Sequence, residues 1–144
     1  MSPMISLYAV ATLLMVSVSL EVEAKTMCVR GVGKLMCKSD PMKAANLEID
    51  MKDYDGLPLD SDDHMGTTWT SLNGSFEVSG CGHDVGPWNM PDPYIRIKHF
   101  CPPSDNPSST VQRKIKIFMG RTFLPKIVQI GTIYLDDVRT RQKA

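Results

Sequence analysis

Four basic side chains alternate with isoleucines in two short segments of this chain. They are Arg96, Lys98, Lys114 and Lys116. If both segments are strands with the isoleucines turned inward, all four cations share the outer face of a sheet. Neighbouring strands lie about 4.8 Å apart, so these like charges repel each other unless an anion offsets them. Two interpretations stay open: a solvated face that keeps the strands from aggregating, or a binding face for an anionic lipid headgroup, a glycan or a receptor.

A group of aspartates lies within one loop segment. The group comprises Asp53, Asp55, Asp60, Asp62 and Asp63. Carboxylate oxygens are the ligands that Ca²⁺ prefers, but the spacing is not that of an EF-hand, so an ordinary acidic loop is the first interpretation and a Ca²⁺ site the second. The histidines are scattered along the chain, and the cysteines lack the short spacings of a zinc site. We expect neither a resident metal nor another cofactor.

The tripeptide Asn73-Gly74-Ser75 fits two different roles. It is a sequon for N-linked glycosylation, which requires an exposed position in a secreted protein. An Asn-Gly pair is also the preferred sequence for a tight turn with positive φ. We expect a hairpin turn here, with Asn73 at its tip as a candidate glycosylation site.

The elements that position these residues are predicted to be strands throughout. Period-two alternation, as in the segment from Leu47 to Lys52, places apolar residues on one face and charged residues on the other. Nothing indicates a helix longer than two turns. The pattern predicts strands near residues 28–37, 46–53, 64–70, 74–79, 93–100, 112–119 and 127–135. Their regular spacing, with Pro- and Gly-rich connections, predicts an all-β, seven-stranded sandwich.

The cysteines test this layout, because a disulfide requires Cα atoms within about 7 Å. If consecutive strands run mostly antiparallel, Cys28 and Cys81 lie at one end of the sandwich, and Cys37 and Cys101 at the other. Of the three possible pairings, only Cys28–Cys81 with Cys37–Cys101 joins cysteines at the same end. We therefore predict these two disulfides.

The first 24 residues have the features of a cleaved secretion signal. An apolar run from Ile5 to Leu20 leads to Val22-Glu23-Ala24, where small or modest residues occupy the positions that a signal peptidase requires. A membrane-spanning helix needs roughly 20 apolar residues. We expect residues 1–24 to be a signal peptide and residues 25–144 to be one secreted, extracellular domain that does not span a membrane. The net charge of +0 gives no reason to expect nucleic acid as a partner.

Several segments, taken in order, resemble the nematode transthyretin-like family. They are GVGKLMC at 31–37, DYDG at 53–56, DSDD at 60–63, PYIRIKHFC at 93–101, QRKI at 112–115 and IGTIYLD at 130–136. The match extends over nearly all of the chain after residue 24. The resemblance implies a transthyretin-like seven-stranded β-sandwich and a secreted protein.

The resemblance also bears on activity. Transthyretin carries thyroid hormones between its subunits, and a related branch hydrolyses 5-hydroxyisourate with the help of a C-terminal Tyr-Arg-Gly-Ser. The present sequence ends in the residues 138–144, VRTRQKA, without that tetrapeptide. We therefore expect no enzyme, and instead a secreted protein that binds an extracellular partner through a sheet face or loops. The alternative is a carrier of a small apolar ligand, a hormone or lipid, held within the sandwich or between subunits.

Overall fold

A computed structural model describes residues 25–56, 62–84 and 90–138 of the chain. The expected signal peptide of residues 1–24 lies outside the described residues, as does Asp60 of the acidic group.

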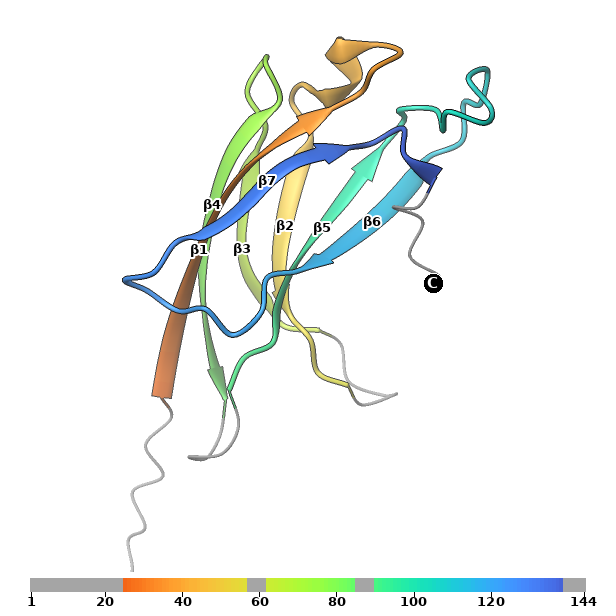
Figure 1. Cartoon of the computed structure of the whole chain (residues 1–144). Coiled ribbons are helices and arrows are strands. Elements are labelled where there is room, and N and C mark those ends of the chain that lie inside the picture. The colour runs from red at the N-terminus through yellow and green to blue at the C-terminus, as the bar shows by residue number, and fades with distance from the viewer. Residues whose placement is uncertain (1–24, 57–61, 85–89, 139–144) are drawn as a thin grey trace, which may run out of the picture.

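The described residues form seven strands in two sheets, which confirms the predicted all-β sandwich (Figure 1). The strands are β1 (Lys25–Met36), β2 (Glu48–Asp53), β3 (His64–Trp69), β4 (Ser75–Asp84), β5 (Pro93–His99), β6 (Arg113–Phe118) and β7 (Val128–Tyr134). One sheet has the order β4-β1-β7 and the other the order β3-β2-β5-β6. All pairings are antiparallel except that of β1 with β7, which is parallel.

Two elements differ from the sequence expectation. Strand β4 was expected to end near residue 79 and instead continues to Asp84, because its second half pairs with the start of β1. A short 3₁₀-helix, η1 (Pro41–Ala44), follows β1, and the Asp40 side chain caps it by accepting a hydrogen bond from the Met42 amide at 3.1 Å. Pro41 suits the first turn of a helix because no partner is needed there for its missing N–H.

The turn at Asn73-Gly74 is present, but the expected hairpin is wrong. Ser71 and Gly74 close the turn with a backbone hydrogen bond of 2.9 Å. The strands on either side then separate, because β3 pairs with β2 in one sheet and β4 pairs with β1 in the other. Gly74, rather than Asn73, adopts the positive φ, at 83°. Turn chemistry is local, whereas the choice of sheet for each strand depends on the packing of the whole core.

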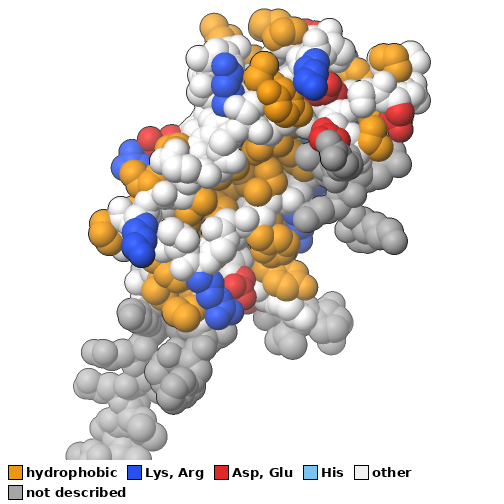
Figure 2. Space-filling view, viewed as in Figure 1, with side chains coloured by type: hydrophobic (Ala, Val, Ile, Leu, Met, Phe, Trp, Pro, Cys, Tyr) orange, Lys and Arg blue, Asp and Glu red, His pale blue; other side chains and the backbone are white. Residues whose placement is uncertain are grey.

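The inward faces of both sheets supply the core. Val29 and Leu35 from β1, Ile49 and Met51 from β2, and Ile95 from β5 are fully buried. The core approaches the surface along the side where β6 and β7, each an edge of its own sheet, face one another. Figure 2 shows hydrophobic side chains gathered on this side of the molecule.

Both disulfides join the cysteines that the strand alternation pairs. Cys28 is bonded to Cys81 within one sheet, where the two residues lie directly opposite each other with Cα atoms 4.0 Å apart. Cys37 is bonded to Cys101 across the sandwich, with Cα atoms 5.9 Å apart, and so ties the end of β1 to the end of β5. The two sheets are therefore linked covalently beside η1.

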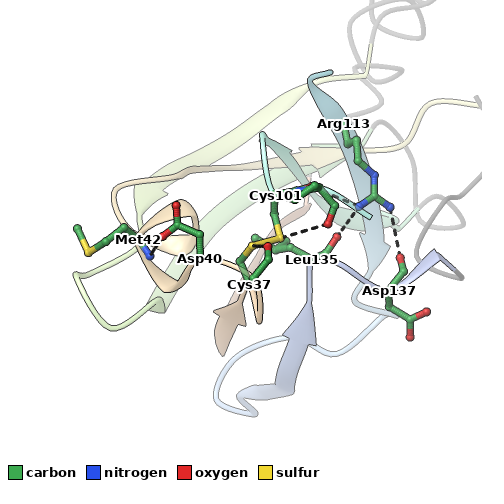
Figure 3. Close-up of a disulfide and its surroundings, with 9 residues drawn as sticks. Cys37, Asp40, Met42, Cys101, Arg113, Leu135 and Asp137 are labelled. Carbon is green, nitrogen blue, oxygen red and sulfur yellow. Dashed lines mark hydrogen bonds between the residues drawn. A yellow bond between two sulfur atoms is a disulfide. The ribbon is translucent and has the colours of Figure 1, made fainter. Parts of the chain in front are cut away.

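Arg113 holds the chain after β7 against this cross-sheet disulfide. Its guanidinium donates to the carbonyl oxygens of Leu135 at 2.7 Å, Asp137 at 3.3 Å and Cys101 at 3.5 Å. Figure 3 shows the side chain reaching these carbonyls next to the sulfur atoms of Cys37 and Cys101. Arg113 therefore has a structural role and is not one of the cations on the outer face of its sheet.

Candidate functional site

The four predicted cations lie together on the outer face of the β3-β2-β5-β6 sheet. Arg96 of β5 lies directly opposite Lys116 of β6, and Lys98 lies opposite Lys114. The alternating residues Ile95, Ile97 and Ile115 are buried in the core. We call the surface formed by these four side chains the basic face.

A carboxylate from the neighbouring strand offsets the charge of Arg96. Asp50 of β2 lies opposite Arg96, is 7% exposed and accepts a hydrogen bond from the guanidinium. The second oxygen of Asp50 lies 3.1 Å from His64 Nδ1 on β3. A hydrogen-bonded ion pair at such a sheltered position is much less screened than one in water, so Arg96 is largely neutralised within the fold.

Lys116 is neutralised in a different way, by a carboxylate and aromatic rings. Its ammonium lies 3.4 Å from Asp62 Oδ2, 4.2 Å from the centre of the Tyr94 ring and 5.5 Å from that of Tyr54. The Tyr94 hydroxyl also donates to Asp62. Burial alone would raise the pKa of Asp62, but the hydrogen bonds from Tyr94 and the Asp55 amide, together with Lys116, outweigh it and hold that pKa below 3.8. Burial and the Asp62 carboxylate raise the pKa of Tyr94.

Lys98 and Lys114 make up the remaining half of the basic face and differ from the first half. Both side chains are exposed, and they lie directly opposite each other on adjacent strands. Among the residues that the structure describes, neither lysine forms an ion pair, although the exposed Glu48 begins the adjacent strand β2. Like charges directly opposite in a sheet are unfavourable. This lysine pair is therefore the place on the basic face where an external anion would lower the energy most.

Two members of the acidic group, Asp53 and Asp62, are used within the protein. Asp53 is 4% exposed, and its carboxylate accepts a hydrogen bond from the Asp92 amide at 2.7 Å. Asp62 contacts Tyr94 and Lys116, as described above. Within the described residues, no three His, Cys, Asp or Glu side chains are grouped so that they could hold a metal ion. The proximity of the aspartates in sequence therefore does not produce a cluster of free oxygens among the residues described.

Asn73 is a central residue of the turn, and its side chain stabilises the turn further. Its Oδ1 accepts hydrogen bonds from the Ser71 hydroxyl at 2.6 Å and the Ser75 amide at 3.0 Å. The residue is exposed, and among the described residues nothing bonds to its amide nitrogen. That nitrogen is the atom to which a glycan would be attached.

The three histidines are not brought together. His64 lies on β3 and His83 on β4, in different sheets, while His99 at the end of β5 is fully buried. Neither ring nitrogen of His99 has a hydrogen-bond partner among the residues that the structure describes. Burial, and secondarily the positive charge of Arg113, lowers the pKa of His99 to about 4. Its alternation with Ile95 and Ile97 indicated an inward position, but nothing local in the sequence revealed an unpartnered imidazole in the core.

Comparison with known proteins gives consistent matches. The model of the transthyretin-like family matches residues 32–119. Transthyretin-like protein 5 of Caenorhabditis elegans is 33% identical over 102 residues, which cover 71% of this chain and 67% of that protein. Transthyretin-like protein 46 of the same organism is 26% identical over 117 residues, covering 77% of this chain and 61% of that protein. The chain thus spans about two thirds of the length of the curated relatives that it matches.

One solved structure aligns with most of this chain. A 9R-lipoxygenase from Cyanothece PCC8801 aligns with 90% of this chain and 20% of its own, at 23% identity and a TM-score of 0.48. No helix among the described residues is long and apolar enough to cross a membrane.

Proposed function

Because the chain belongs to the transthyretin-like family, we propose that it is a secreted, non-enzymatic protein that binds an anionic extracellular partner on its basic face. The observation that carries this proposal is the contrast within that face. Arg96 and Lys116 each have a carboxylate from the same fold, whereas the exposed pair Lys98 and Lys114 has none among the described residues.

Secretion is supported by the two disulfides and by the character of residues 1–24. Disulfides form and persist in oxidising compartments and are rare in the cytosol. All four cysteines are bonded in the structure, which suits an extracellular protein. The apolar run from Ile5 to Leu20, followed by Val22-Glu23-Ala24, fits the expected export signal.

A binding role, rather than an enzymatic one, is supported by the positions of the titratable residues. General acid–base catalysis requires a side chain within hydrogen-bonding reach of the reacting group. His99 lies inside the core, and His64 and His83 belong to different sheets. The described part of the chain therefore offers a rigid scaffold with a charged surface, and we assign it no reaction.

The test is to reverse the charge of the lysine pair and measure binding to anionic surfaces. The double variant Lys98→Glu/Lys114→Glu is compared with the native protein on heparin and on vesicles of phosphatidylcholine with and without phosphatidylserine. A basic residue near an anionic membrane contributes about 1 kcal/mol. Loss of both lysines alone should therefore weaken binding by about 30-fold, and reversal of their charge should weaken it further.

The matched control is Lys43→Glu/Lys126→Glu, which changes the net charge equally at positions outside the basic face. This control should keep most of the affinity, and native binding should weaken as salt rises towards physiological strength. If the protein binds heparin but not the vesicles, the partner class is a sulfated glycan. If it binds phosphatidylserine vesicles but not heparin, the partner class is a lipid headgroup. If the two double variants lose affinity equally, or if the native protein is retained by neither surface, the proposal is wrong.

A further inference from the structure

A pocket of about 390 Å³ lies at one end of the sandwich, and no residue of the basic face lines it. Three elements enclose it: the last residues of β1, the helix η1 and the turn that contains Leu72 and Asn73. Figure 1 shows η1 and the β3–β4 turn side by side at this end of the molecule. A hydrogen bond of 2.8 Å from the Leu35 amide to the Gly74 carbonyl fixes the turn against β1, so the walls of the pocket are held in place.

The walls of the pocket are mostly apolar. Leu35 and Ala44 form a buried floor, and Leu72, at 70% exposure, forms an open apolar rim. A leucine so exposed gains little in the free protein, but it would gain from contact with an apolar ligand, at about 25 cal/mol for each Å² removed from water. Binding pockets for small molecules begin at about 300 Å³, so this pocket is large enough for a small organic ligand.

The charged residues of the pocket are of one sign. Among the described residues, Lys34 and Lys38 line it and no acidic residue does. The Lys38 ammonium lies 4.6 Å from the centre of the Tyr134 ring. Within the described residues neither lysine is paired with a carboxylate. A mostly apolar pocket whose charged lining residues, among those described, are two lysines is complementary to a molecule with an apolar body and one negative end.

We propose that this end pocket binds a small amphipathic carboxylate. Its apolar part lies against Pro41 and Leu72, and its carboxylate lies near Lys34 and Lys38. Neither lysine of the basic face's exposed pair lines the pocket, so the site does not depend on the proposed function. It also differs from a carrier site inside the sandwich or between subunits, because its walls are the end of β1, η1 and a turn of one chain.

The test is a calorimetric titration of the secreted protein, after glycosidase treatment, with three probes that share a ten-carbon chain. Decanoate carries a negative charge, 1-decanol none and decyltrimethylammonium a positive charge, all used below their aggregation concentrations. We expect decanoate to bind most tightly and the cation most weakly. The variant Lys34→Gln/Lys38→Gln should lower the affinity for decanoate about five- to tenfold and leave that for decanol nearly unchanged. Leu72→Asp should weaken both.

The control is Lys98→Gln/Lys114→Gln, which removes the same charge from the basic face and should leave decanoate binding unchanged. This control also separates the two proposals, since the basic face can fail its test while the pocket passes. Equal affinity for decanoate and the cationic probe would overturn the inference. So would an unchanged affinity in Lys34→Gln/Lys38→Gln, or no binding of decanoate at millimolar concentration.

Discussion

Mild acid should destabilise this protein through His99. The imidazole is fully buried, and within the described part of the chain neither nitrogen has a hydrogen-bond partner. Its pKa is lowered to about 4 from an ordinary value of 6.5, chiefly by burial. The folded protein thus keeps His99 neutral at a pH where the unfolded chain binds a proton. Stability from this residue is complete above pH 6.5 and is lost as the pH falls towards 4.

The magnitude follows from the two pKa values. One unit of pKa difference corresponds to about 1.4 kcal/mol, so the full difference amounts to about 3 kcal/mol below pH 4. Between pH 7 and pH 5 the free energy of unfolding should fall by about 2 kcal/mol. The pKa values of Asp62 and Asp92 lie below 3.8. At Asp62, burial raises the pKa, but hydrogen bonds and the charge of Lys116 outweigh burial. At Asp92, the hydrogen bond from Arg121 is the largest cause. Their contribution is lost only at lower pH, which leaves His99 to dominate the interval from 7 to 5.

The assay is urea unfolding at pH 7, 6 and 5, followed by tryptophan fluorescence. His99→Leu should remove most of the pH dependence, and His99→Gln provides a second non-titrating variant in case the first does not fold. His83→Gln, at an exposed position on β4, should keep the native pH dependence. A native protein equally stable at pH 7 and pH 5, or an unchanged slope in the His99 variants, would refute this reasoning.

Two further predictions concern the turn after β3. Gly74→Ala should lower the free energy of unfolding by at least about 2 kcal/mol, because Gly74 has φ 83° and a Cβ there would lie 2.2 Å from the Leu35 carbonyl oxygen. Gly120 has φ 66° but open space around it, so Gly120→Ala should lower the free energy of unfolding by only about 1 kcal/mol. Equal losses for the two variants in urea unfolding would contradict the steric argument. Asn73 should carry an N-linked glycan in protein secreted from eukaryotic cells, because nothing in the described structure bonds to its amide nitrogen. Glycosidase should then shift the mass of the native protein and of Ser75→Thr but not that of Asn73→Gln, and an unshifted native mass would rule the glycan out.

The sequence alone was sufficient for the properties that depend on local pattern. Alternation in segments such as Tyr94 to His99 located the strands to within a few residues, because a strand turns successive side chains to opposite faces. Alternation of strand direction then placed Cys37 and Cys101 at the same end, where the structure joins them. The shared face of Arg96, Lys98, Lys114 and Lys116 followed from the same periodicity.

Tertiary structure alone decided which of those cations are available. Arg96 receives its carboxylate from Asp50, 46 residues away, and Lys116 receives its own from Asp62, 54 residues away. No local pattern gives these distances, because they depend on the order of strands in the sheet and on the path of a loop. The same holds for the turn at Gly74, which passes between sheets, and for the pocket beside η1. The sequence determined where charges of one sign gather, and the fold determined which of them it neutralises, since ion pairing depends on proximity in space and not on proximity along the chain.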